Sequence, residues 1–255
     1  MVEYHSSIHK EHANFIRQQS MFFVASAPLA GRHINLSLEG HLARSFAVLD
    51  ANTVAYVDAT GSGCETISHM YENGRITVMF CSFGALPEIM RLFCTGRIVE
   101  SDDKDYEELK ASMGCDVEST GARAIVVLKV SKVQTSCGFG VPLVGELVSG
   151  SEGGKNDLES GFSKRDTMGV WPPKVLGQDM MLGWQQECSF KSLDGLTGLR
   201  SARRARGEWM MLEDFEAWQR RVGRQWDALL VGMLIMITGM WALHALGLLT
   251  VEVRN

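Results

Sequence analysis

The sequence predicts a mainly β (α+β) fold, an antiparallel barrel with a few short helices, followed by one transmembrane helix. Many short apolar runs lie between turn residues, and few helical patterns separate them. This arrangement favours an antiparallel barrel over an alternating βαβ sheet. The transmembrane helix is predicted from an uncharged apolar run, Ala228 to Val251, because a run of this length can cross a bilayer.

The strand candidates are runs of apolar residues bounded by Gly, Pro, Asn or Asp. In chain order they are residues 22–27, 33–38, 45–49, 54–58, 75–80, 90–99 and 122–133. We find no internal repeat among them. They are therefore expected to form one domain.

Helical patterns occur at residues 7–19, 63–72 and 103–113. The first carries an apolar stripe at helical spacing. The second begins after a Gly-Ser-Gly turn and ends at Asn73-Gly74, and the third has acidic residues in its first turn, where the helix dipole favours them.

Composition suggests four consecutive regions. A barrel domain is expected over residues 7–147. A Gly- and Ser-rich stretch before Arg165 begins a linker and C-terminal extension, 148–200. An Arg-rich segment, 201–225, precedes the membrane helix, 226–251.

Charge places the barrel on the cytosolic side of the proposed membrane. Arginines are concentrated before the apolar run, and only Arg254 follows it, so the positive-inside rule keeps the preceding chain cytosolic. Residues 228–251 cover about 36 Å at the rise of an α-helix, enough to span with some tilt. We expect a single-pass C-terminal (tail) anchor. The alternative is a buried helix of a soluble fold.

Overall charge and histidine and cysteine spacing exclude other classes. The chain of 255 residues has a net charge of −5, so nucleic acid is not an expected partner. The 6 cysteines contain no CxxC pair, which is consistent with reduced thiols in the cytosol. His5, His9 and His12 share a helical spacing but have no cysteine nearby, so we expect an exposed polar helix face there and no metal site.

The segment with the clearest chemical signature runs from Val57 to Phe83, where a strand leads through Thr-Gly-Ser-Gly directly into a helix. The N–H groups at a helix N-terminus attract anions, and the hydroxyls of Thr60, Ser62 and Thr66 lie beside it, so a phosphate cradle is one interpretation. The other is an ordinary turn with Ser62 or Thr60 as the N-cap. The segment matches neither a complete GxGxxG fingerprint nor a P-loop.

Several motifs in sequence order make this chain similar to the pyridoxamine 5'-phosphate oxidase-like family of FMN-binding split barrels, in particular its fungal and bacterial branch. They are MFFVASAPL at 21–29, HINLSLEG at 33–40, VDATGSGCETISHMYENGRITVMFCSF at 57–83, GALPEIMRLFCTGRIVE at 84–100, ARAIVVLKVSKVQTSCGFGVPL at 122–143 and SLDGLTGL at 192–199. The resemblance covers about residues 7–200.

This resemblance implies a six-stranded antiparallel split β-barrel that forms a homodimer and holds FMN at the subunit interface. Asn35, Leu36 and Ser37 would lie against the isoalloxazine ring. Thr60, Ser62, Gly63 and Thr66 would face the ribityl phosphate. The residues expected to approach from the second subunit are Ser136, Cys137, Gly138 and Gly140.

One departure from the family pattern bears directly on cofactor binding. The branch has Ser-Pro-Lys-Gly where this chain has Ser37-Leu-Glu-Gly40, so Glu39 replaces a lysine that would pair with phosphate. The basic residues expected around the substrate phosphate of a true pyridoxamine 5'-phosphate oxidase are also missing, so that compound is not the expected substrate.

The sequence thus supports two functions. The first is an FMN-binding, flavin-dependent oxidoreductase acting on an unidentified small molecule and tethered to a membrane. The second is a degenerate split barrel without tight cofactor binding, which acts as a membrane-tethered interaction module. Other members of the superfamily bind a deazaflavin or haem, and haem ranks below FMN because no axial ligand can be chosen from the sequence.

Overall fold

The structure is a computed structural model, and it describes residues 2–114, 121–144, 162, 163, 165, 183–223 and 225–247. The chain divides into two compact units, Met1–Met168 and Gly169–Asn255, which are treated separately below. Most of the predicted Gly- and Ser-rich linker, and Leu248 to Val251 of the predicted membrane run, lie outside the described residues.

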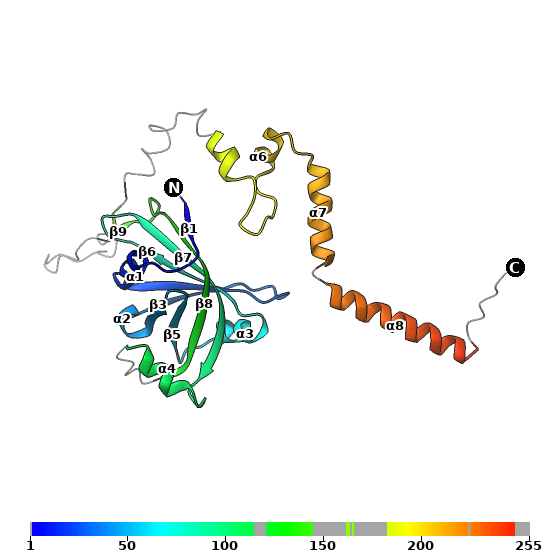
Figure 1. Cartoon of the computed structure of the whole chain (residues 1–255), viewed down its shortest axis with the longest axis horizontal. Coiled ribbons are helices and arrows are strands. Elements are labelled where there is room, and N and C mark those ends of the chain that lie inside the picture. Colours follow the sequence, from blue (N-terminus) through cyan, green and yellow to red (C-terminus); the bar gives the residue numbers. More distant parts are fainter. Residues whose placement is uncertain are drawn as a thin grey trace, which may run out of the picture. The chain divides into compact units, whose positions relative to one another are not determined.

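The first unit is built on an antiparallel sheet that curls into a half-barrel (Figure 1). Its strands are β1 (Glu3–His5), β2 (Met21–Ser26), β3 (Asn35–Gly40), β4 (Phe46–Asp50), β5 (Thr53–Ala59), β6 (Arg75–Cys81), β7 (Glu88–Glu100) and β8 (Ala122–Cys137). The order is β3-β2-β6-β7-β8-β5-β4, and β1 pairs with β8. The predicted fold class is confirmed.

All the strands proposed from the sequence are present as β2 to β8, and β1 is additional. The sheet therefore has 8 strands where the resemblance implies six. β8 is 16 residues long, so one of its edges pairs first with β5 and then, beyond the end of β5, with β1. With only 3 residues, β1 is too short to show an alternating pattern. A separate two-stranded ladder joins β9 (Leu143–Val144) and β10 (Phe162–Ser163).

The short helices are α1 (Lys10–Arg17), α2 (Leu42–Ser45), α3 (Glu65–Glu72) and α4 (Tyr106–Ser112). Helices α1, α3 and α4 lie within the three predicted segments. Helix α2 was not predicted, and it begins after His41, whose φ of 53° is left-handed. The predicted polar face of α1 is wrong, because His12 is buried. Burial lowers the pKa of His12, as do the nearby His5 and His9.

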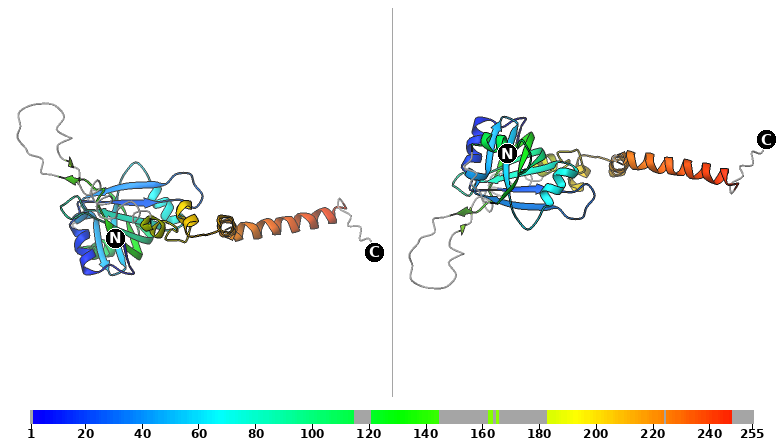
Figure 2. Two further views of the ribbon diagram at one scale, coloured as in Figure 1. Left: turned by 90° about the horizontal axis from the view of Figure 1, so that it is seen from above. Right: turned by 90° about the horizontal axis from the view of Figure 1, so that it is seen from below.

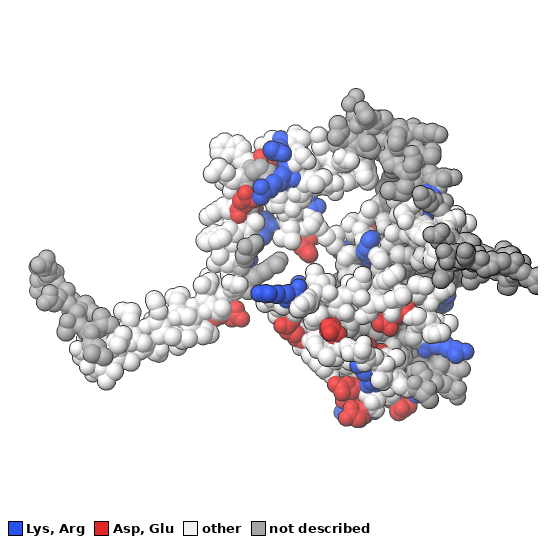
Figure 3. Space-filling view, turned by 180° about the vertical axis from the view of Figure 1, so that it is seen from behind, with Lys and Arg blue, Asp and Glu red and all other residues white. Residues whose placement is uncertain are grey.

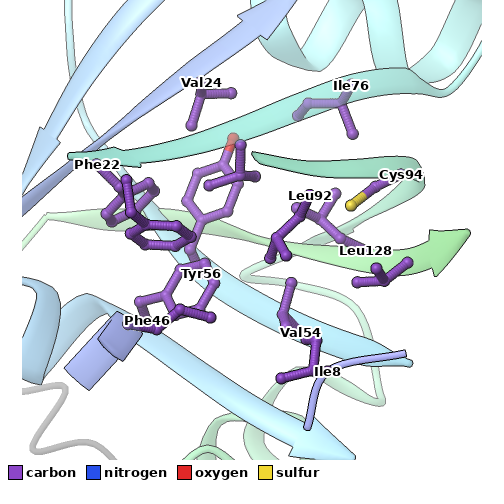
Figure 4. Close-up of a cluster of buried hydrophobic side chains, with 14 of the residues drawn as sticks. Ile8, Phe22, Val24, Phe46, Val54, Tyr56, Ile76, Leu92, Cys94 and Leu128 are labelled. Carbon is purple, nitrogen blue, oxygen red and sulfur yellow. The ribbon is translucent and has the colours of Figure 1, made fainter. Parts of the chain in front are cut away.

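Aromatic rings fill the centre of the curled sheet (Figure 4). The Phe22 ring lies 5.1 Å from Phe46 and 5.6 Å from Tyr56, both edge-on. The Phe80 ring packs on the same group, with its centroid 5.3 Å from that of Phe46. A second apolar cluster packs α4 against the sheet. Edge-on rings at these separations add to the free energy of burial, so this core holds the half-barrel together.

Two cysteines and one histidine are packed inside the first unit. Cys81 and Cys94 are both buried, and burial raises the pKa of the Cys94 thiol to about 12. His69 is also buried, with its Nδ1 atom 2.9 Å from the Ser26 hydroxyl oxygen. These side chains belong to the core. Cys115 lies outside the described residues.

The second unit contains α6 (Arg200–Ala205), α7 (Met210–Gly223) and α8 (Trp226–Ala245). Helix α8 is a single uninterrupted helix of 20 residues (Figure 2). It has a mean hydropathy of 1.9 and 0% of it is buried in the structure. On the face shown in Figure 3, α8 carries acidic atoms only near its start and no basic atoms. By length and composition this helix can cross a membrane.

Candidate functional site

A solvent-open cleft of about 460 Å³ lies where β3, the end of β5 and the start of α3 meet. β3 contributes side chains from alternate positions, because successive residues of a strand point to opposite faces. The loop 60–64 forms one wall, and Arg123 of β8 also lines the cleft. The sequence segment with the clearest chemical signature is therefore the one that builds this cleft.

Most of the predicted site residues are brought together here. Those that line the cleft are Asn35, Ser37, Thr60, Ser62, Gly63 and Thr66. The amide nitrogen of Asn35 donates to the hydroxyl oxygen of Thr66 at 2.8 Å and to that of Ser37 at 3.1 Å. The bond to Thr66 ties β3 to the first turn of α3, and the bond to Ser37 lies within β3.

Helix α3 begins without a side-chain cap. Its N-cap residue is Cys64, whose side chain makes no capping hydrogen bond. The hydroxyl of Thr60 instead donates to the carbonyl of Gly121 at 2.8 Å. The alternative of a turn capped by Ser62 or Thr60 is therefore wrong, and the first-turn N–H groups of α3 lack a side-chain cap.

Arg123 is a charged cleft residue that the sequence analysis missed, as are Asp58 and Glu65. In the pairing of β5 with β8, Asp58 faces Ala124 and Ala59 faces Ala122, so Arg123 is the extra residue of a β-bulge. Its Nε donates to the Asp58 carboxylate at 2.5 Å, and a terminal nitrogen donates to the Gly63 carbonyl at 2.7 Å. A bulge redirects a side chain that regular pairing would send elsewhere.

Three carboxyl groups, those of Glu39, Asp58 and Glu65, line the cleft with this one guanidinium group. Burial raises the pKa of Glu39, and the charge of Asp58 raises it further, whereas Arg123 lowers it. The Glu65 carboxylate folds back over Gly63, where it would collide with any added Cβ atom. The chain's own carboxylate thus occupies the approach to the α3 N-terminus, a position that suits an anion.

The remaining predicted residues do not line the cleft of the same chain. Leu36 lies on the opposite face of β3 from Asn35 and Ser37, because strand side chains alternate, and it is 66% exposed. Ser136 and Cys137 lie at the far end of β8, roughly 45 Å of strand from Arg123, and Gly138 follows them.

The cleft can be compared with what an FMN phosphate requires. Hydroxyl groups and uncapped helix N–H groups are suitable donors, and Thr66 and Ser62 stand beside them. The charge is unsuitable, since three carboxyl groups outnumber the one guanidinium, which is already paired with Asp58. The geometry therefore fits a ribityl phosphate only when Glu65 moves away, and the charge weakens its binding.

Fold and cleft together define a protein of the split-barrel class, with a cleft beside the edge strand β3. The chain matches the family profile described as Pyridoxamine 5'-phosphate oxidase over residues 8–137. It is also 44% identical over 234 residues to the Pyridoxamine 5'-phosphate oxidase family protein ustO of Aspergillus flavus, a match that covers 90% of this chain and 92% of the relative. The chain belongs to the pyridoxamine 5'-phosphate oxidase family.

Solved structures with a similar arrangement include HupZ of Group A Streptococcus, which is 22% identical, with a TM-score of 0.39 over 58% of this chain and 99% of that one. An FMN-binding protein of Syntrophomonas wolfei is 10% identical, with a TM-score of 0.35 over 48% of this chain and 80% of that one. Because these identities and TM-scores are low, the family assignment rests on the two sequence matches and not on the solved structures.

Proposed function

We propose that this protein binds FMN in the cleft and acts as a flavin-dependent oxidoreductase on a small molecule. The observation that carries the proposal is the convergence of Asn35, Ser37, Thr60, Ser62, Gly63 and Thr66 on one cleft at the uncapped N-terminus of α3, in a member of this family. When bound, the flavin supplies hydride or electron transfer. The chain supplies orientation through Asn35 and the hydroxyl groups.

Glu39 sets the strength of this binding. Its carboxylate faces the cleft where the family pattern has lysine, so a phosphate dianion meets repulsion at close range. We expect weak binding of FMN by the natural chain. Replacing Glu39 with lysine exchanges repulsion for attraction and should tighten binding by at least about tenfold, or ~1.4 kcal/mol.

The test is a titration of FMN into full-length protein in a non-denaturing detergent, after an absorbance spectrum of the purified protein. Quenching of flavin fluorescence gives the dissociation constant for the natural chain, Glu39→Gln and Glu39→Lys. Glu107→Lys, an exposed position on α4, makes the same charge change away from the cleft and serves as the control. Equal constants for Glu39→Lys and Glu107→Lys would contradict the placement of the phosphate.

The second candidate function is a tethered interaction module that lacks a tight cofactor. It is favoured by the contacts that the anion-binding groups already make. The Glu65 carboxylate folds over Gly63, and the Arg123 guanidinium is paired with Asp58. A colourless natural protein whose Glu39→Lys variant also fails to bind FMN would support this second function over the first.

We propose that the protein works as a homodimer. On the edge strand β3, Leu36 is 66% exposed on the outer face, and Leu38, which also borders the cleft, is 58% exposed. A second chain covering these leucines would remove an apolar patch from water and is the source from which Ser136 and Cys137 would reach the cleft. Light scattering on the detergent-solubilised protein should give two chains per particle, and Leu36→Asp with Leu38→Asp should give one.

We also propose that α8 tethers the protein to a membrane, with the barrel domain (7–147) on the cytosolic side and residues 148–225 as the connection. α8 spans about 30 Å, the thickness of the hydrocarbon core. Its exposed apolar side chains support this role. The protein should resist carbonate extraction, and Leu234→Arg with Ile237→Arg should release it. Extraction of the natural chain by carbonate would contradict the tether.

A further inference from the structure

Three histidine rings meet where β1, paired with β8, leads into α1. His5 ends β1, His9 precedes α1 and His12 lies in the first turn of α1. Their ring centroids are 4.6 Å apart for His5 and His12, 5.1 Å for His9 and His12, and 5.2 Å for His5 and His9. One ring nitrogen of each lies within 4.8 Å of the others. None of the three lines the cleft.

The backbone that carries these rings is fixed from several sides. β1 pairs with β8 so that His5 faces Val133. The Ile8 N–H donates to the Ala51 carbonyl at 2.7 Å, and the Asn52 amide donates to the Ser6 carbonyl at 2.7 Å. The same Asn52 amide also reaches the Val130 carbonyl at 3.1 Å. The histidines therefore occupy a preformed arrangement, and little conformational entropy is lost when they bind a ligand together.

Three imidazole groups at this spacing are suited to a divalent transition-metal ion. Zn²⁺ binds histidine nitrogen at about 2.0–2.1 Å, so two such nitrogens in a tetrahedral site lie about 3.4 Å apart. Small side-chain rotations bring nitrogens from within 4.8 Å to that separation. His5 Nε2 also lies 3.9 Å from the Glu3 carboxylate, whose negative charge favours a dication. Imidazole ligands select zinc, copper, nickel or iron over magnesium or calcium.

Metal binding competes with existing hydrogen bonds of these rings, which include one between the His12 side chain and the Ser7 backbone. His12 Nδ1 accepts a hydrogen bond from the His9 backbone N–H at 3.1 Å. A metal bound at Nδ1 takes the lone pair that accepts this hydrogen bond. A metal bound at Nε2 requires the ring proton to sit on Nδ1, so Nδ1 can no longer accept the bond from His9. The loss of one such bond costs about 1 kcal/mol, far less than coordination by three imidazoles supplies.

We propose that His5, His9 and His12 form a binding site for one divalent transition-metal ion of the Zn²⁺ type, with the remaining coordination position open to water. The exposed polar helix face expected from the sequence is not formed, because His12 is buried and His5 lies on β1. A site with three protein ligands and one open position is typical of zinc centres that act on a bound molecule.

The test uses full-length protein without a polyhistidine tag, in a non-denaturing detergent and freed of metal with a chelator. Co²⁺ is the spectroscopic probe, followed by displacement with Zn²⁺ against a chromogenic chelator. His5→Ala and His9→Asn each remove one ligand, and asparagine keeps a good N-cap at position 9. His33→Ala, an exposed histidine outside the cluster, is the matched control. Buried His12 is left unchanged so that folding is preserved.

The expected result is one equivalent of Co²⁺ with visible d–d bands and no sulfur charge-transfer band, all lost on adding Zn²⁺. Affinity for Zn²⁺ should fall at least tenfold in His5→Ala and in His9→Asn and stay unchanged in His33→Ala. Thermal unfolding should shift upward with Zn²⁺ in the natural chain and not in the two cluster variants. No binding by the natural chain, or equal binding by the cluster variants when circular dichroism shows them folded, would overturn the proposal.

Discussion

Arg123 of β8 and Asp58 of β5 form an ion pair with 2.5 Å between Nε and the carboxylate oxygen, inside a β-bulge at the edge of the cleft. The Asp58 side chain is only 11% exposed, so Arg123 replaces water as a hydrogen-bond donor to its carboxylate. The same guanidinium donates to the Gly63 carbonyl and so connects both strands to the loop before α3. Arg123 thus holds the end of β5 and the loop 60–64 together.

Arg123→Met should destabilise the fold by about 1–3 kcal/mol, because a mostly buried carboxylate and a carbonyl both lose their donor. Asp58→Asn in the same chain should recover part of this loss, since it removes the unpaired charge. Arg97→Met, an exposed position on β7, is the control and should change stability by less than about 0.5 kcal/mol. Chemical denaturation of all four chains measures the differences; equal loss in the single and double variants would argue against the ion pair.

Glu39→Gln should raise stability at neutral pH, and the gain should disappear in acid. The folded-state pKa of Glu39 is raised by burial and by Asp58, so the folded protein holds its proton more tightly than the unfolded chain. Ionisation therefore costs stability as the pH rises from the usual value of 4.5 through the folded pKa. Denaturation curves for both chains across this pH range check the sign. If the stability gain of Glu39→Gln persists at low pH, altered packing and not the lost ionisation of Glu39 is its cause.

Gly138→Ala should destabilise the protein by about 1–3 kcal/mol, whereas Gly140→Ala should have little effect. A Cβ at position 138 would lie 2.8 Å from the Glu88 backbone nitrogen and 3.0 Å from the Pro87 carbonyl carbon, neither of which can move freely. A Cβ at position 140 meets nothing within 4 Å. Thermal unfolding of the matched pair separates a packing role for Gly138 from a general effect of losing glycine.

Cys137 should react with a thiol reagent in the native state, and Cys94 should not. Cys137 is exposed, whereas Cys94 is buried with its pKa raised to about 12, so almost no thiolate forms there. Alkylation at pH 8 followed by peptide mass spectrometry should label position 137 in minutes and position 94 only in denaturant. Rapid native labelling of Cys94 would show that the β6–β8 core opens easily.

The order and type of most elements follow from local patterns. Strands β2 to β8 combine apolar runs with flanking turn residues, and α3 begins after a Gly-Ser-Gly turn, so each is visible within a few residues of sequence. The exceptions are β1 and α2, which have 3 and 4 residues and form because neighbours hold them. Such short elements have no periodicity of their own.

The sequence by itself determined the family, the antiparallel barrel, the apolar helix and six of the cleft residues, from Asn35 to Thr66, because β3 and the 57–72 segment carry them at short range. Tertiary structure alone decided the roles of Arg123, Leu36 and His5. A bulge turned Arg123 into the cleft, strand alternation turned Leu36 away from it, and pairing with β8 brought His5 to His9 and His12. Register and bulges set which side chains meet, and they depend on contacts between strands far apart in the chain.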